Sequence, residues 1–420
     1  MPYLQHIHYA VASLGLPPVL VVGILLITGF YSGKASKLCR LPSIIGFMVA
    51  GVVLGGSLIG LLTENLQNDL GFITETALGF VALSIGLELD LRTIRRLGTG
   101  IIWAIFAESF GAFFVVLGGM YLLTRDLPMS LLFAAVAPAS APAGTVAVIQ
   151  EYRAKGNLTK ALYAVVGFDD GLGIIIFGFA AALAKVYLAR EGGGTEAQGL
   201  VQALLPPLRE VFLSVGVAGL AALALCPLLR RDSDRRSTFI LTVAGVLVVV
   251  GVSTRLHLSL ILTTMILGML IVNTQPRAVV DRISAPLGDV MPLLFVLFFA
   301  LAGAHLDLSM LPSLGLIGAV YILTRTVGLM AGAWAGSTVG RLEPKICRYL
   351  GMGILSQAGV AIGLALVVQK EFGGLGAHGK LISTQILTTV TATCIFFELI
   401  GPVLTRIALT RAGEINQVPE

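Results

Sequence analysis

Apolar residues recur along this chain in runs of about twenty, the length that crosses about 30 Å of hydrocarbon as an α-helix. Short polar stretches separate the runs. Such a pattern predicts about 13 membrane-spanning helices. They lie near residues 17–33, 42–61, 71–90, 99–123, 129–150, 159–187, 208–229, 237–254, 258–274, 289–306, 312–338, 349–369 and 381–408. The fold class predicted from the pattern is an all-α polytopic membrane protein.

Composition agrees with this class, because only 12% of the residues are charged, against about 25% in soluble proteins. The net charge of +5 comes from Lys and Arg in the loops after odd-numbered spans, such as Arg92–Arg96 and Arg230–Arg236. By the positive-inside rule these loops are cytoplasmic, which places the N-terminus outside and the C-terminus inside. We therefore expect an integral protein of the plasma (inner) membrane, with membrane lipid and not nucleic acid as a partner.

Two adjacent carboxylates, Asp169 and Asp170, lie in the middle of the predicted span 159–187. One charge at the bilayer centre costs about 2.5–3.5 kcal/mol, so a pair is not placed there for stability. A solvated loop would accommodate both, but the apolar residues on either side, such as Ile174–Phe177, argue against it. Neighbouring helical residues are about 100° apart, so one carboxylate can face an aqueous cavity and bind a proton or a small cation. Competition between these two ligands would couple their movements.

An internal repeat favours a transporter. Residues 82–91 resemble residues 299–308, and Asp307 follows Asp90 at an offset of 217 residues (307 − 90). We predict one transmembrane unit over residues 1–411, followed by a short cytoplasmic tail at 412–420. Within it lie repeat 1 (about 42–187), a linker (190–206) and repeat 2 (about 258–408). Inverted repeats with paired broken helices mark many secondary transporters, although chance similarity between Leu- and Gly-rich helices is the alternative.

Two spans contain residues that interrupt a helix. Pro138 and Pro142 remove backbone donors from the fifth span, and Gly144 follows them. The freed carbonyls and helix ends can coordinate a cation. The side chains placed to help are Ser140 and Thr145 there, and Ser356 and Gln357 at the matching position of the twelfth span. One proline kink alone is more often structural, but two breaks at matching repeat positions favour a binding site.

The same offset relates Glu108 to Arg325 (325 − 108 = 217), and each lies deep in an apolar span. Each would be costly without a partner, so the sequence predicts an ion pair between them. Asp169 is the rival partner of Arg325. For Glu108, a purely stabilising pair and a direct role in transport are both compatible with the sequence.

Other chemistries find little support. The four cysteines, Cys39, Cys226, Cys347 and Cys394, show neither metal-ligand nor redox spacing. Neither a phosphate-cradling motif nor a nucleophile–base arrangement is visible, so we expect no cofactor and no enzyme, and transport driven by an ion gradient. The alternatives that stay open are a cation channel with the acidic pair as its selectivity ring, and a sodium-coupled solute symporter.

These motifs resemble the monovalent cation:proton antiporter superfamily of sodium/proton and potassium/proton exchangers, in its double-aspartate branch. The resemblance rests on Leu41–Phe47, Gly86–Asp90, the Ala-Pro-rich break, Asp169–Asp170 and Arg325. It implies a core domain with two crossed broken helices that moves against a dimerisation domain, and a homodimer. It also implies that Asp170 is the essential aspartate that binds Na⁺ or K⁺ in competition with a proton, with Asp169 as its neighbour.

Arg325 departs from the lysine that several electrogenic members carry at this position. Arginine stays protonated in proteins, so it cannot carry a transported proton. The predicted function is therefore a secondary active antiporter that exchanges one proton for one Na⁺, K⁺ or Li⁺ by alternating access.

Overall fold

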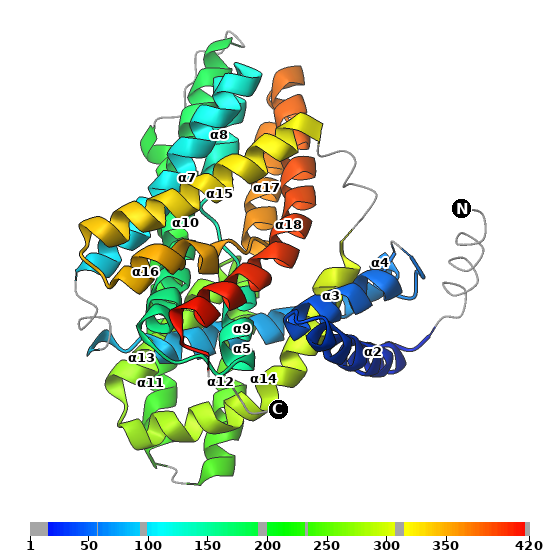
Figure 1. Cartoon of the computed structure of the whole chain (residues 1–420), viewed down its shortest axis with the longest axis vertical. Helices are drawn as coiled ribbons and strands as arrows, with labels where there is room; N and C mark the ends of the chain where they lie inside the picture. The colour runs from blue at the N-terminus through cyan, green and yellow to red at the C-terminus, as the bar shows by residue number, and fades with distance from the viewer. Residues whose placement is uncertain are drawn as a thin grey trace. The chain divides into compact units, whose positions relative to one another are not determined.

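The structure, a computed structural model, describes residues 16–56, 58–92, 99–191, 200–231, 234–306 and 315–415. Regular structure in these residues is helical throughout (Figure 1). Nine of the described helices are long and apolar enough to cross a membrane, and three shorter apolar helices accompany them. The predicted class of all-α membrane protein is confirmed, while the count of about 13 spans stays a prediction.

The first half of the described chain contains α2 (Pro18–Leu38), α3 (Ser43–Leu54), α4 (Glu64–Asp69), α5 (Gly71–Glu88), α7 (Gly100–Thr124), α8 (Leu127–Val136), α9 (Pro142–Glu151) and α10 (Asn157–Glu191). The second half contains α11 (Leu200–Arg231), α12 (Arg235–Leu256), α13 (Leu260–Thr274), α14 (Arg277–Ala304), α15 (Gly315–Val339), α16 (Pro344–Tyr349), the 3₁₀ helix η2 (Leu350–Ile354), α17 (Gly359–Phe372) and α18 (Gly376–Ala412).

Both predicted breaks are present. The fifth span is divided into α8 and α9 by residues 137–141, and the twelfth into η2 and α17 by residues 355–358. Pro142 is the first residue of α9, a position where a proline's missing N–H costs nothing. Part of the predicted linker, residues 192–199, lies outside the described residues, and α11 already begins at Leu200, inside the stretch predicted as linker.

Contacts divide the chain into two compact units. Unit 1 comprises residues 1–90, 146–151 and 213–309, and unit 2 comprises residues 91–145, 152–212 and 310–420. Unit 1 therefore holds α2–α5 and α12–α14, and unit 2 holds α7, α8, α10 and α15–α18. Both helix breaks belong to unit 2. Asp307 of the sequence repeat lies outside the described residues.

Unit 1 is built on close helix contacts through glycine. A Cβ added at Gly51 of α3 would collide with the carbonyl oxygen of Ala300 on α14, and one added at Gly303 would collide with the backbone of Met48. An apolar cluster of Val21, Leu25, Leu301 and neighbouring residues fills the space beside this contact. Glycine permits the close approach of two backbones that such contacts need.

The start of α3 is closed by an acidic side chain from residues 146–151 of α9, the part of that helix that belongs to unit 1. The carboxylate of Glu151, at the end of α9, accepts hydrogen bonds from the Ser43 backbone N–H (3.0 Å) and the Ser43 hydroxyl (2.8 Å). Lys37 forms an ion pair with the same carboxylate at 3.2 Å. A negative charge at this end satisfies free N–H groups and complements the helix dipole.

In unit 2, α7 and α15 pack along a run of glycines spaced four residues apart. Gly328, Gly332 and Gly336 of α15 each bring α15 against the backbone of α7. A Cβ at Gly332 would lie 2.7 Å from the Cα atom of Glu108. The close contact thus covers Glu108, which is one of the residues singled out by the sequence.

We expect Gly332→Ala to lower the free energy of unfolding by about 1–3 kcal/mol, because the added methyl group collides with the α7 backbone. Gly118 on α7 is a matched control, since a Cβ there meets no atom within 4 Å. Gly118→Ala should leave stability unchanged or raise it by up to about 1 kcal/mol. Thermal unfolding of both variants in one detergent makes the comparison, and equal melting temperatures would contradict the packing role.

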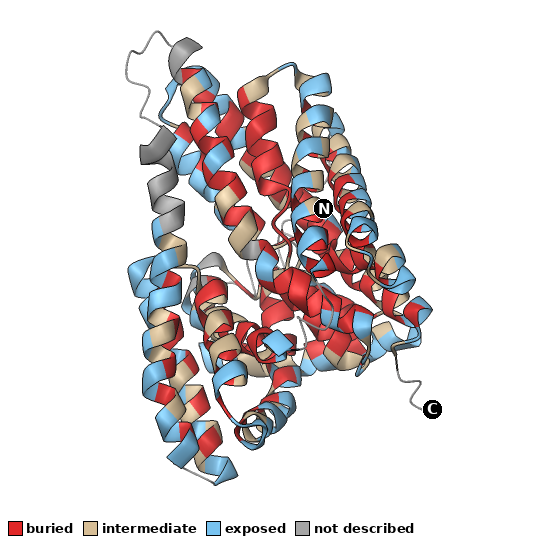
Figure 2. Ribbon diagram, turned by 90° about the vertical axis from the view of Figure 1, so that its left-hand side faces the viewer, coloured by how far each residue is buried: buried red, intermediate tan, exposed pale blue. Residues whose placement is uncertain are grey.

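Large apolar side chains are exposed along one face of α7. Trp103, Phe106, Phe110 and Phe114 are 58%, 47%, 39% and 61% exposed, and successive phenylalanine rings stack at 6.3 and 6.2 Å. Figure 2 shows buried and exposed positions sharing the same helices. An apolar face of this kind is typical of a helix that borders lipid.

Candidate functional site

The two helix breaks of unit 2 lie against each other. The backbone N–H of Ala141 donates to the carbonyl of Ser356 at 2.8 Å, and the Thr145 hydroxyl donates to the carbonyl of Gly353 at 2.7 Å. A Cβ added at Gly144 would lie 3.0 Å from the Ser356 hydroxyl oxygen, so glycine keeps this approach open. Thr145 was predicted as a possible cation ligand. Its hydroxyl hydrogen instead forms a hydrogen bond that joins the two breaks.

Arg325 of α15 supplies donors that the breaks lack. Its Nε donates to the carbonyl of Ala137 at 2.9 Å, and its Nη2 donates to the carbonyl of Ala139 at 3.0 Å. Its Nη1 donates to the carbonyl of Leu355, in the second break, at 2.9 Å. In a continuous helix, Ala137 would receive its bond from Ala141, whose N–H instead crosses to the other break. One fully buried guanidinium thus satisfies carbonyls of both breaks.

The predicted ion pair between Arg325 and Glu108 is not formed, nor is the rival pair with Asp169. The three guanidinium nitrogens of Arg325 bond to backbone carbonyls, and the guanidinium lies 4.4 Å from the ring centroid of Phe397. The prediction failed because the C-terminal ends of helices carry negative partial charge, and the carbonyls there satisfy a guanidinium as well as a carboxylate does.

Glu108 and Asp169 are joined through a hydroxyl. The oxygen of Ser109, beside Glu108 on α7, lies 2.7 Å from Glu108 Oε1 and 3.1 Å from Asp169 Oδ1. All three residues are fully buried, and Glu108 Oε2 and Asp169 Oδ2 have no hydrogen-bond partner. One turn further along α10, a Cβ added at Gly173 would lie 3.9 Å from the Cα atom of Ala139 in the first break. Asp169 therefore sits where α7, α10 and the first break meet.

Several buried oxygens around the breaks have no hydrogen-bond partner. Among the described residues these include the hydroxyls of Ser140 and Ser356 and the Oε1 atom of Gln357. The amide nitrogen of Gln357 donates to the Tyr321 hydroxyl at 3.1 Å, which fixes the direction of this side chain. Hydroxyl, amide and carboxylate oxygens are the ligands that hard cations take.

The backbone of Asp170 belongs to α10, next to Asp169, but its side chain lies outside the described residues.

The start of α10 is closed by a residue near the C-terminal end of the chain. Glu414 accepts hydrogen bonds from the backbone N–H groups of Leu158 (2.8 Å) and Thr159 (2.7 Å). Glu414, predicted to be part of a cytoplasmic tail, thus caps the helix that carries both aspartates.

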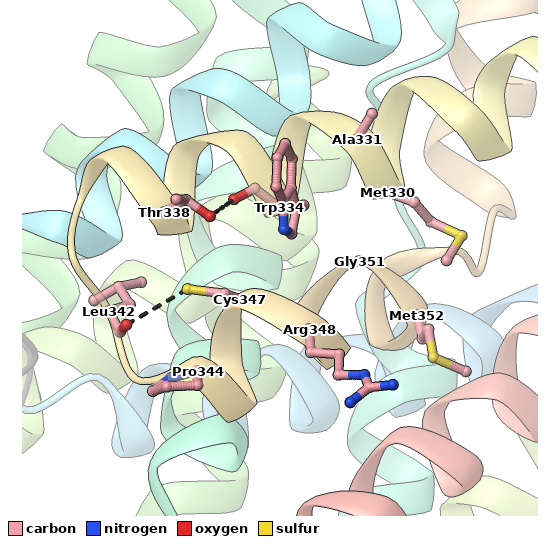
Figure 3. Close-up of a pocket in the computed structure, with 10 residues that line it drawn as sticks. All are labelled: Met330, Ala331, Trp334, Thr338, Leu342, Pro344, Cys347, Arg348, Gly351 and Met352. Atoms are coloured by element: carbon pink, nitrogen blue, oxygen red, sulfur yellow. Dashed lines mark hydrogen bonds between the residues drawn. The ribbon is translucent and has the colours of Figure 1, made fainter.

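A separate cavity of about 740 Å³ lies between α15 and the α16–η2 segment (Figure 3). Met330 and Trp334 of α15, Cys347 and Arg348 of α16, and Met352 of η2 line it. None of its lining residues is a carboxylate, and its walls are mostly apolar. The cavity is therefore distinct from the carboxyl cluster at the breaks.

The whole chain can be compared with known proteins. The family model described as "Sodium/hydrogen exchanger, transmembrane" matches residues 22–410. The chain belongs to the sodium/hydrogen exchanger family. This match confirms the family that the sequence motifs resembled, the sodium/proton and potassium/proton exchangers.

Two relatives match most of this chain. One is the ammonium/H⁺ antiporter subunit AmhT of Alkalihalophilus pseudofirmus, 20% identical over 77% of this chain and 80% of that protein. Another is the high-affinity Na⁺/H⁺ antiporter NhaS3 of Synechocystis, 21% identical over 96% of this chain and 93% of that protein. Both are named as antiporters, which agrees with the prediction of a transporter and not an enzyme.

Solved structures show the same fold for this chain. The sodium/proton antiporter MjNhaP1 of Methanocaldococcus jannaschii, in a structure at pH 8, matches with a TM-score of 0.68 at 18% identity, over 94% of this chain and 96% of that one. A second structure of MjNhaP1, from electron microscopy, matches with a TM-score of 0.73 at 17% identity, covering 95% and 99% of the two chains.

The structure adds residues that sequence reasoning missed. Ser109 follows Glu108 directly, and a hydroxyl beside a buried carboxylate was a visible signal for a hydrogen-bond link. Tyr321 lies four residues before Arg325, hence on the same face of α15, but carried no signal of its own. Glu414 of this exchanger had no signal, because its partner residues lie more than 250 positions earlier in the chain.

Proposed function

We propose that this chain exchanges protons for Na⁺, K⁺ or Li⁺ by alternating access, and that Asp170 binds cation or proton in competition. The observation that carries the proposal is the pair of abutting helix breaks in unit 2, with the buried carboxylate of Asp169 beside the first break. Half-helix ends and unwound carbonyls at such breaks coordinate ions in secondary transporters. The competition between one cation and one proton supplies the coupling.

In this proposal the cation is held by oxygens from both breaks. The free oxygens of Ser140, Ser356 and Gln357 supplement the aspartates, while Gly144 and Thr145 keep the two breaks together. Arg325 takes no part in carrying protons, because arginine stays charged and its nitrogens are bonded to carbonyls. We therefore propose one proton per cation. We propose that unit 2 is the moving core implied by the resemblance and that unit 1 is the dimerisation domain of a homodimer.

Exchange should be measurable in proteoliposomes that contain a pH-sensitive dye and an imposed proton gradient. Addition of Na⁺, K⁺ or Li⁺ separately should restore dye fluorescence for at least one cation, through proton movement in the opposite direction. Absence of a response to every cation, in a folded preparation, would rule out the proposal. Cation flux without proton movement would instead indicate a channel or a sodium-coupled symporter.

The one-for-one stoichiometry has its own readout. An electroneutral exchange moves no net charge, so the ion gradients at which flux stops should not change when a membrane voltage is imposed. A reversal point that shifts with voltage would contradict one proton per cation while leaving antiport itself intact.

A further inference from the structure

The cavity between α15 and the α16–η2 segment has no part in the proposed exchange (Figure 3). Its volume of about 740 Å³ is in the range of pockets that hold small organic ligands. Met330, Trp334 and Met352 supply the largest apolar parts of its wall. Thioether and indole side chains pack well against apolar ligands. The cavity therefore offers a hydrocarbon chain a surface to contact.

The polar side chains of the cavity leave one charged donor group available. The hydroxyl of Thr338 and the thiol of Cys347 donate to backbone carbonyls of their own segment, at 2.7 and 3.4 Å. Arg348 is exposed, and among the described residues its guanidinium has neither a hydrogen bond nor an ion pair. Its one contact is with the Tyr349 ring, whose centroid lies 5.8 Å away. A free guanidinium beside a cavity without carboxylates favours an anionic ligand.

The cavity adjoins a face of α15 that is typical of contact with lipid. Leu323, Val327, Met330 and Trp334 follow one another at intervals of three or four residues, so they share one face of the helix. All four are exposed, at 66%, 50%, 37% and 59%. Met330 and Trp334 also line the cavity. A hydrocarbon chain along this face would reach the cavity without leaving apolar surface, which favours a membrane lipid over a solute from water.

The free guanidinium belongs to a basic segment between two predicted spans. Arg341, Lys345 and Arg348 lie between the spans predicted at 312–338 and 349–369. By the positive-inside rule we expect this segment at the cytoplasmic surface, where anionic lipids create a negative potential. The planar donors of a guanidinium can bond two oxygens of one phosphate.

We propose that this cavity binds an anionic phospholipid, with an acyl chain against Met330, Trp334 and Met352 and the phosphate on Arg348. Phosphatidylglycerol, which carries one net negative charge, represents this class. Phosphatidylcholine has the same acyl chains and phosphate, but its choline cancels the charge that Arg348 would attract.

A lipid in this cavity contacts α15 and η2 together. The two elements already approach closely, since a Cβ added at Gly351 of η2 would lie 2.7 Å from the Cα atom of Met330. The 3₁₀ helix η2 ends at Ile354, directly before the second break at residues 355–358. The bound lipid thus steadies the half-helix that leads into this break, without contacting the transported ion.

Tryptophan fluorescence tests the proposal directly, because the chain contains two tryptophans. Trp334 in the cavity is 59% exposed, and Trp103 on α7 is 58% exposed. Both lie near the predicted cytoplasmic ends of their spans, so a general attraction of anionic lipid to that surface acts on both. Trp103→Phe leaves Trp334 as the reporter, and Trp334→Phe leaves Trp103. Each variant is reconstituted in phosphatidylcholine vesicles with a minor fraction of brominated phosphatidylglycerol or of brominated phosphatidylcholine, whose bromine atoms quench an indole on contact.

We expect the preference for phosphatidylglycerol, measured by quenching, to be about fivefold greater at Trp334 than at Trp103. This is the enrichment that one arginine near the membrane surface supplies. Equal preferences at the two tryptophans would overturn the proposal, because ordinary bilayer lipid would then account for the quenching.

The role of Arg348 is tested in the Trp103→Phe background. Arg348→Gln should abolish the additional preference at Trp334. Arg341→Gln is the matched control, since it removes the same charge from the same segment at an exposed residue that does not line the cavity. It should retain the preference, and thermal unfolding verifies that both variants are folded. A preference that survives Arg348→Gln, or that both variants lose equally, would overturn the proposal. These measurements need no transport, so their result is independent of the proposed exchange.

Discussion

Replacing Arg325 by alanine should abolish exchange and severely destabilise the protein. The substitution removes the donors to Ala137, Ala139 and Leu355, and each buried carbonyl left without a partner costs about 1–3 kcal/mol. The total is comparable with the whole stability of many folded domains. Melting temperature and the yield of monodisperse protein in detergent measure this loss.

Arg325→Lys separates the geometry of the side chain from its charge. A lysine ammonium keeps the positive charge near both carboxyls but cannot match the planar fork that reaches both breaks at once. We expect it to fold with reduced stability and to lose at least about tenfold in exchange rate, because the breaks are less firmly held. If Arg325→Ala cannot be purified in folded form, the stability and exchange rate of Arg325→Lys test the role of Arg325 instead.

A double substitution distinguishes this account from a direct ion pair. In an ion pair, removing Glu108 would relieve the charge left unbalanced by Arg325→Ala and would recover stability. Because the guanidinium bonds to carbonyls, Glu108→Ala should give Arg325→Ala little recovery. Restoration of more than half of the lost stability would contradict the role of Arg325 at the breaks.

Asp170→Asn should abolish exchange while the protein remains folded. The amide cannot lose or gain a proton at neutral pH, and it lacks the charge that attracts a cation. We expect a loss of at least about 100-fold in cation-dependent proton movement, equivalent to about 2.7 kcal/mol. The proteoliposome assay, at matched protein content and with thermal unfolding as the control for folding, gives the comparison.

Asp169→Asn is the informative companion to this substitution. An asparagine can still accept the Ser109 hydrogen bond, so the fold should persist. Loss of the charge beside the first break should weaken apparent cation affinity by about tenfold, with measurable exchange remaining. If Asp170→Asn retains exchange activity and Asp169→Asn does not change it, the assignment of the exchange site to Asp170 is wrong. The assignment is also wrong if Asp169→Asn reduces exchange more than Asp170→Asn does.

Much of the fold could be predicted from sequence, because hydrophobic length and proline position act locally. The apolar runs predicted the helices, and Pro138, Pro142 and the repeat offset predicted both breaks. Where Arg325 would bond could not be predicted in this way. From sequence, the expected partner of a buried charge is a side chain of opposite charge. The acceptors here are backbone carbonyls, which are free to accept and close to Arg325 only because two distant helix breaks meet.

The carboxyl cluster was beyond sequence reasoning for a related reason. Glu108 and Asp169 are 61 residues apart (169 − 108), and only the packing of α7 against α10 brings Ser109 between them. The contact of α7 with α15 did have a sequence signal in Gly328, Gly332, Gly336 and Gly340, spaced by four. Small residues at that spacing indicate a close helix contact, but not which helix is the partner.

The cap at the start of α10 connects Glu414, near the C-terminal end of the chain, to the helix that carries the aspartates. Glu414 holds the first turn of the helix on which Asp169 and Asp170 reside. Shortening the chain to before Glu414 is therefore not a neutral trimming of a tail, since it withdraws three hydrogen bonds from that helix. A ligand or modification that drew Glu414 away would act at a distance on the aspartates, through the anchoring of a single helix.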